Sequence, residues 1–288
     1  PGIGSYIYKK AEDLQSLVVE TEVPKLFFIP GDSLFPGTAN LPYFTKQKIL
    51  KELSALPADY VILDLGAGSA YNTIDFYLSS SAGIILSTPE TTAILSAYSF
   101  LKSTVYRLLF RSFKAKSRER EIIREFVSEP IEGNSTSFTD LIPKLAELSQ
   151  ESAQHAQKQL ASFFPRVVLN LGKSNKDFVI GAKLRDITSK NIGVGMEYIG
   201  FLPDEPQVSR SIFERRPHML LQPQSPFSQA VVTVARKLAA SAPRTNPQLY
   251  SDDEDIRELK KEFADQTGSG EAFSEDTISE EASPEENG

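Results

Sequence analysis

The stretch YVILDLGAG, residues 60–68, decides the fold expected for this chain. Val61, Ile62 and Leu63 form an unbroken apolar run that ends at an acid, Asp64. A short run of this kind, bounded by turn residues, predicts a strand buried on both faces of a parallel sheet. The glycines that follow allow backbone N–H groups to approach an anion, because no Cβ is in the way. The stretch therefore predicts a ligand site beyond the end of a strand or, in the plainer interpretation, an ordinary tight turn.

Strand and helix patterns alternate along the rest of the chain. Further strands are predicted at residues 25–29, 84–86, 166–171 and 194–202, and helices at residues 45–56, from Pro89 to 101, 107–126, 141–164, 177–188, 208–215 and 227–238. The alternation predicts an α/β fold with a mostly parallel sheet flanked by helices. Right-handed crossovers bring the carboxyl ends of such strands to one edge. We therefore expect Asp64, residues 87–90, Asn170 and residues 203–205 to surround one cleft.

Composition narrows the class of protein. The chain has 288 residues, 40% of them hydrophobic, with 18 Phe, which suffices for a sizeable core. The absence of Cys excludes disulfides, thiolate metal sites and a cysteine nucleophile, and two His residues argue against a histidine-rich zinc site. The sequence shows neither a membrane-spanning apolar run nor a signal-peptide pattern, which favours a cytoplasmic protein.

The negative charge is concentrated at the carboxyl end. Residues 251–288 hold 14 acids and 3 bases, whereas residues 1–250 hold 24 acids and 28 bases. We therefore expect a nucleotide-binding domain at residues 1–242 and an acidic, largely disordered tail at 243–288, with one helix predicted at 252–264. Anionic lipid would repel this tail, which argues against membrane contact through it. The basic helix at 107–126 is interpreted as a solvated surface, and no direct nucleic-acid contact is predicted.

Neither of the common phosphate-binding fingerprints is present. Gly172, Lys173 and Ser174 come near to a phosphate loop, but the position of its first glycine is Val167, inside a predicted strand. The dinucleotide fingerprint fails because Tyr71 stands where its third glycine belongs.

Two ligand classes fit the DLGAG segment, residues 64–68. In the first, Asp64 holds a water of a Mg²⁺ shell and the Gly68 N–H faces the terminal phosphate of a nucleotide. In the second, the segment is the glycine-rich loop of an S-adenosylmethionine-dependent methyltransferase and Glu90 binds the ribose. Ala70 then replaces a glycine that is usual in such loops.

Three segments together resemble MinD/ParA-type ATPases, which are deviant P-loop proteins. DLGAG (residues 64–68) resembles the switch II loop of that family, STPETTAILSAY (87–98) the strand–helix junction after it, and IGFLPDEPQVSRSIFERRP (199–217) the adenine-side loop and its helix. The resemblance is greatest to the FlhG/YlxH-like regulators of flagellar number and placement, and it runs from residue 1 to about residue 238.

The resemblance implies roles for particular residues. Asp64 would bind Mg²⁺ through water, Gly68 would sense the γ-phosphate of ATP, and Gly66 and Ala67 would complete that loop. Asn170 would hydrogen-bond adenine, and Pro203 and Asp204 would line the base pocket; without the family, Asn170 is more simply a satisfied amide at a strand end. The resemblance further implies a homodimer that forms with ATP and a flagellar-assembly or other cargo partner.

The glycine-rich phosphate loop of the family is not found in this sequence. It would precede the segment that matches Pro1, so we expect that the chain lacks its natural beginning. Phosphoryl transfer needs the loop, its lysine and Mg²⁺ together, so we expect the chain as given neither to hydrolyse ATP nor to bind it tightly. A decayed, non-catalytic interaction module is a further interpretation.

Overall fold

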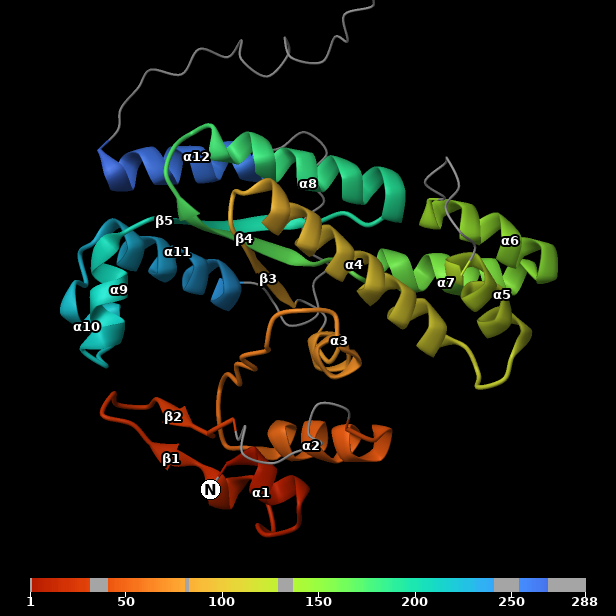
Figure 1. Cartoon of the computed structure of the whole chain (residues 1–288), viewed down its shortest axis with the longest axis horizontal. Coiled ribbons are helices and arrows are strands. Elements are labelled where there is room, and N and C mark those ends of the chain that lie inside the picture. Colours follow the sequence, from red (N-terminus) through yellow and green to blue (C-terminus); the bar gives the residue numbers. More distant parts are fainter. Residues whose placement is uncertain (1, 32–40, 81–82, 129–136, 241–253, 269–288) are drawn as a thin grey trace, which may run out of the picture.

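A three-stranded parallel sheet lies at the centre of the computed structural model (Figure 1). The structure describes residues 2–31, 41–80, 83–128, 137–240 and 254–268. The strands β3 (Ile84–Ser87), β4 (Arg166–Gly172) and β5 (Glu197–Pro203) follow one another in the sheet in chain order. All pair in parallel, with Ile84 opposite Arg166 and Arg166 opposite Glu197. The architecture confirms the expected α/β fold with a mostly parallel sheet flanked by helices.

Helices cover the two faces of this sheet. On one face, Val168 and Ile199 pack against Ala230 of α11 (Pro226–Ala240). On the other face, Val167 and Leu169 belong to the main core, to which the following helices contribute: α4 (Thr91–Ser112), α5 (Arg118–Ser128), α6 (Leu141–Leu148), α7 (Gln150–Ala161), α8 (Asp177–Ile192) and α12 (Glu254–Thr267). Successive residues of a strand point to opposite faces, so the near-continuous apolar run of β4 is buried on both.

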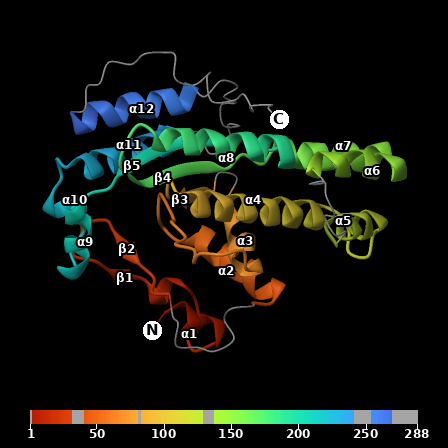
Figure 2. The ribbon, with the colours of Figure 1, turned by 45° about the horizontal axis from the view of Figure 1, so that its top comes forward.

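A separate group of elements precedes the sheet. It contains α1 (Ile3–Ile7), the short 3₁₀ helix η1 (Gln15–Leu17), β1 (Val19–Glu20), β2 (Phe27–Phe28) and α2 (Tyr43–Ala55). Tyr6, Leu14, Leu17 and Ile49 form its own small core. In both whole-chain views this group lies apart from the three-stranded sheet, with α3 (Tyr71–Tyr77) between them (Figures 1 and 2).

The predicted buried strand at residues 25–29 is wrong. β2 is only two residues long, pairs antiparallel with β1, and leaves Phe27 and Phe28 more than half exposed. A two-stranded ribbon covers neither of its faces by itself, so its apolar side chains remain in contact with solvent.

The predicted central strand at residues 60–65 is also wrong. These residues form no strand, and Ile62 is 89% exposed. Within the described part of the chain, β3 pairs with β4 alone, so its other edge carries no strand. The apolar run has the composition of a buried strand but lacks the backbone partner that strand formation requires.

Several helices differ in extent from the prediction. The segment 107–126 contains the end of α4 and most of α5, and the segment 141–164 divides at Ser149, whose extended backbone separates α6 from α7. The Ser149 hydroxyl accepts a hydrogen bond from the Glu151 N–H, which caps α7. The remaining elements are η2 (Phe138–Asp140), α9 (Pro206–Phe213) and α10 (His218–Leu221). Among the described helices, none is long and apolar enough to cross a membrane.

The helix predicted at residues 252–264 is present as α12 and packs against β5. Ile256, Leu259 and Phe263 are buried, as their helical spacing predicts. Part of the segment assigned to the acidic tail is therefore packed on the core, while residues 241–253 and 269–288 lie outside the description.

Candidate functional site

An open cleft of about 1640 Å³ separates the N-terminal group from the sheet. Its walls include residues 61–69, β3 with the loop after it, the first half of α4, and Asn170 of β4. β3 exposes Ile84 and Leu86 on this side, so the cleft has an apolar wall next to the edge of β3 that has no strand partner among the described residues.

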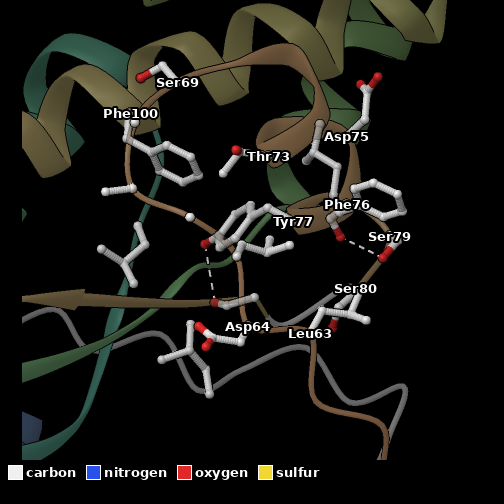
Figure 3. Close-up of a pocket in the computed structure, with 18 of the residues that line it drawn as sticks. Leu63, Asp64, Ser69, Thr73, Asp75, Phe76, Tyr77, Ser79, Ser80 and Phe100 are labelled. Atoms are coloured by element: carbon white, nitrogen blue, oxygen red, sulfur yellow. Dashed lines mark hydrogen bonds between the residues drawn. The ribbon is translucent and has the colours of Figure 1, made fainter. Parts of the chain in front are cut away.

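Asp64 lies in the open part of this cleft. Its side chain is exposed, and no ion pair or hydrogen bond engages it within the described residues. In Figure 3, the chain passes from Leu63 and Asp64 to Ser69 and then enters α3. An exposed carboxylate with free oxygens suits a hydrated cation better than a structural ion pair.

The loop after Asp64 depends on one glycine. Gly68 has φ +99°, a left-handed conformation that residues with a Cβ rarely adopt. A Cβ added to Gly66 or Gly68 would meet open space, so solvent and ligands can reach the backbone there. The structure has a bend at residues 67 and 68, where Gly68 takes this left-handed conformation.

Asn170 approaches the same cleft from the middle of the sheet. Its Oδ1 atom is buried and has no hydrogen-bond partner within the described structure. The β4–β5 register shifts between Leu169 and Gly172, and Leu171 has φ +59°, so the strand is irregular here. Because buried acceptors are nearly always paired, the unpaired oxygen indicates a place where a donor group fits.

Pro203 and Asp204 do not line the cleft. They lie beside Asn170 at the end of the neighbouring strand, where Pro203 is in register with Gly172. The Asp204 N–H donates to the Gly172 carbonyl at 2.8 Å, and the Asp204 carboxylate lies 3.8 Å from Lys173 Nζ. The structure thus brings Asp64, Ser87 and Asn170 to one cleft and leaves Pro203, Asp204 and Glu205 at its side.

Residues 172–174, which come near to a phosphate-loop sequence, already bind a carboxylate of the chain itself. Asp177, in the first turn of α8, accepts hydrogen bonds from the Lys173 N–H at 2.7 Å and the Ser174 N–H at 2.9 Å. This carboxylate occupies the donors that a phosphate would need, in agreement with the rejection of the motif from its spacing.

An ion cluster centred on Asp75 was not predicted from the sequence. Asp75 of α3 is 5% exposed and binds Lys46 of α2 at 2.5 Å and Arg107 and Arg111 of α4 at 2.8 Å. Figure 3 shows Asp75 at the other side of the view from Asp64. One feature of the sequence could have pointed to a buried acid here: Asp75 lies between the apolar residues Ile74 and Phe76 in a short helix.

The pKa of Asp75 reflects these partners. Burial by itself would raise the pKa, but hydrogen bonds from Arg107 and Lys46 and the charges of Arg107 and Arg111 outweigh it and lower the pKa to about 2. Asp75 is therefore ionised at neutral pH and joins three helices. Nearby, burial raises the pKa of Tyr77, whose hydroxyl donates to the Gly83 carbonyl (Figure 3).

Among its described residues, the cleft contains few side chains that could bind a metal ion or a methyl donor. Within the described ranges, no three His, Cys, Asp or Glu side chains gather into a metal-binding group. Mg²⁺ keeps most of its waters, so the single carboxylate of Asp64 suffices for it. Glu90, the ribose ligand in the methyltransferase interpretation, precedes α4 and is not among the described residues that line the cleft.

Fold and site define a class: an α/β protein whose cleft is lined by an acid–glycine loop and by a polar side chain from a parallel strand. Comparison with known proteins adds a particular relative. The chain is 33% identical over 131 residues to the flagellum site-determining protein YlxH of Helicobacter pylori (strain ATCC 700392 / 26695). The match covers 43% of this chain and 39% of YlxH, so it spans less than half of the relative. It confirms the resemblance to the MinD/ParA-type family and its FlhG/YlxH-like members.

No family model matches the chain. The solved structure of the MinD cell division protein of Aquifex aeolicus aligns with a TM-score of 0.48 and 16% identity, over 84% of this chain and 75% of that chain.

Proposed function

We propose that this chain is part of a MinD/ParA-like cytoplasmic regulator that binds ATP and Mg²⁺ and acts in flagellar number, flagellar placement or cargo positioning. The observation that carries the proposal is that Asp64 and Asn170, far apart in sequence, both line one cleft. The Asn170 Oδ1 is buried there and accepts no hydrogen bond from any described residue. The similarity to YlxH supports the flagellar role.

The residues of the site divide into a phosphate side and a base side. Asp64 would hold a water of the Mg²⁺ shell, and the Gly68 N–H would face the γ-phosphate, with Gly66 and Ala67 leaving room for it. On the base side, the Asn170 Oδ1 would accept a hydrogen bond from the amino group of adenine, with Pro203 and Asp204 beside it. Bound Mg²⁺ would neutralise the charge that develops on the phosphates during transfer.

The free edge of β3 supports a further element of the proposal. The cleft lies between this edge and residues 61–65, and both sides present backbone groups and apolar side chains without a strand partner among the described residues. We propose that, in the complete protein, one more strand occupies this space and carries the phosphate loop. The complete protein would then dimerise with ATP bound and separate after hydrolysis.

Nucleotide binding by two forms of the protein tests the proposal. We expect this chain alone to show no ATPase activity. We expect the chain extended by its upstream coding sequence to bind ATP and Mg²⁺, measured by thermal shift and calorimetry. Asp64→Asn and Asn170→Ala should each weaken that binding, and the exposed control Asp59→Asn should not.

Three results would contradict the proposal. The first is ATP hydrolysis by the chain alone. The second is binding in the extended protein that is unchanged by both Asp64→Asn and Asn170→Ala. The third is a thermal shift with S-adenosylmethionine and none with ATP, which would favour the methyltransferase interpretation instead.

A further inference from the structure

An exposed apolar and basic surface lies just beyond the end of β5. The α9 patch, as we define it, consists of Arg210, Ile212, Phe213, Arg215 and Arg216. Ile212 is 71% and Phe213 89% exposed, although both are large apolar residues. Exposed apolar side chains grouped in this way commonly mark an interaction site.

The turn after α9 keeps two arginines next to the apolar pair. The Arg215 N–H donates to the Ile212 carbonyl and the Arg216 N–H to the Ser211 carbonyl, which folds the chain back at the end of the helix. Within the described structure, Arg210 pairs with Glu214 at 2.8 Å, whereas no acid is paired with Arg215 or Arg216. The patch therefore carries a net positive charge beside its apolar residues, and the partner that fits it is acidic with a few apolar anchors.

The carboxyl end of this chain has that chemistry. Residues 269–288 contain two large apolar residues, Phe273 and Ile278, and no base; their acids are Glu271, Glu275, Asp276, Glu280, Glu281, Glu285 and Glu286. Opposite charges attract over the Debye length, and burial of the apolar anchors adds a short-range stabilisation of the contact.

The segment follows α12, a helix that packs on β5, and β5 is the strand that leads into α9. Phe263, near the end of α12, packs against Phe201 with ring centroids 4.8 Å apart, and Phe201 precedes the end of β5 by two residues. α9 begins three residues after β5 ends. In both whole-chain views, α9 and one end of α12 lie on the same side of the molecule (Figures 1 and 2). A 20-residue extended segment reaches up to roughly 66 Å, several times the length of the eight-residue helix α9.

We propose that the acidic carboxyl-terminal segment, residues 269–288, docks on the α9 patch of the same chain. Phe273 and Ile278 contact Ile212 and Phe213, while the acids pair with Arg215 and Arg216. The docked segment covers a surface that directly follows Asp204, so another partner with similar chemistry gains access only by displacing it. This inference does not depend on nucleotide binding.

Because the chain contains no Trp, Phe273→Trp supplies a single fluorescent probe in the full chain. We expect blue-shifted emission and slow acrylamide quenching relative to a synthetic peptide of residues 268–288 with the same substitution. The double substitution R215E/R216E should move both values to those of the peptide, as should 1 M salt, where the Debye length is about 3 Å. Phe213→Ser should act in the same direction.

The matched control is K114E/K116E, which makes the same charge change at exposed positions in the turn between α4 and α5. It should leave the emission blue-shifted. Emission equal to that of the free peptide in the unsubstituted background, or a blue shift that R215E/R216E leaves unchanged, overturns the proposal. A blue shift that disappears on dilution also overturns it, because the segment would then dock on a second copy.

Discussion

Asp75 shows how one buried carboxylate can organise three helices. Its partners come from α2 and α4, and its own helix, α3, lies between them. Isolated charges are costly to bury, so this acid is tolerated only because cations surround it. The same ion pair allows Lys46 of α2 to lie buried, at 6% exposure, with its Nζ in contact with the Asp75 carboxylate.

Asp75→Asn should lower the free energy of unfolding by about 3 to 5 kcal/mol, because it leaves Lys46 buried without a counter-charge. Asp59→Asn, at an exposed position, is the control, and its effect should stay within about 0.5 kcal/mol. Chemical denaturation measures both, and equal effects of the two substitutions would contradict the role of the cluster.

The pH dependence of this difference follows from the pKa of Asp75. The pKa is lowered in the folded state from 3.8 to about 2, so the stabilisation is fully present above the unfolded value and is lost as the pH falls toward 2. The gap between the wild type and Asp75→Asn should therefore be constant above about pH 4 and should narrow below it.

Asp177 allows a similar test at the loop after β4. Asp177→Ala removes the acceptor for two backbone N–H groups and should cost roughly 1 to 2 kcal/mol of stability. The control is Asp186→Ala, an exposed acid on the same helix, α8. If the two variants are equally stable, the hydrogen bonds at residues 173 and 174 contribute nothing.

At the scale of elements, the contact between β5 and α11 depends on a glycine. A Cβ added to Gly200 would lie 2.2 Å from Val234 Cγ2 and would require one element to move. Gly200→Ala should therefore destabilise the protein by about 1 to 3 kcal/mol. Adding Val234→Ala should recover much of this loss, and a double-mutant cycle measures the recovery; purely additive effects would contradict the steric explanation.

The packing of α12 on the sheet rests on an aromatic cluster. Phe263 contacts Phe201 and also Phe178, whose ring stacks on Phe201 with centroids 4.1 Å apart. Phe263→Ala should cost about 3 kcal/mol and raise amide exchange throughout α12. Lys261→Ala, on the exposed side of the same helix, should change neither, and unchanged exchange in the Phe263 variant would show that α12 is held by other contacts.

At the scale of the whole molecule, two hydrophobic cores meet at α3. Phe76 packs against the core of the N-terminal group, while its neighbour Tyr77 is buried in the main core. Phe76→Ala should therefore raise amide exchange in α1 and α2 and leave β4 and β5 protected, as hydrogen-exchange mass spectrometry can resolve. Uniform loss of protection would indicate one core instead of two.

The sequence predicted several elements close to the positions that the structure gives them. β4, β5, α8, α11 and α12 appear close to their predicted positions because their apolar patterns find partners within the described fold. The strand predictions at residues 25–29 and 60–65 were wrong. Both segments have the apolar composition of a strand, but a strand also requires a neighbouring strand to pair with. A single sequence reveals the composition of a strand but not the identity of its neighbour.

The candidate site was predictable to a similar extent. Asp64 and Asn170 were expected to share a cleft, and the structure places both in its lining. Pro203 and Asp204 lie at its side because β5 is one strand further from the cleft. The Asp75 cluster was not predicted, because its four members come from three helices and no local sequence pattern shows how those helices pack together. The chemical roles of Asp64 and Asn170 stay predictions.

The short helix α3 has a mechanical consequence. The adjacent side chains of Phe76 and Tyr77 pack in different cores. The seven-residue helix α3 therefore connects the two cores directly. A rotation of this helix would therefore displace side chains in both cores, and it would change the width of the cleft that Phe76 and Tyr77 line.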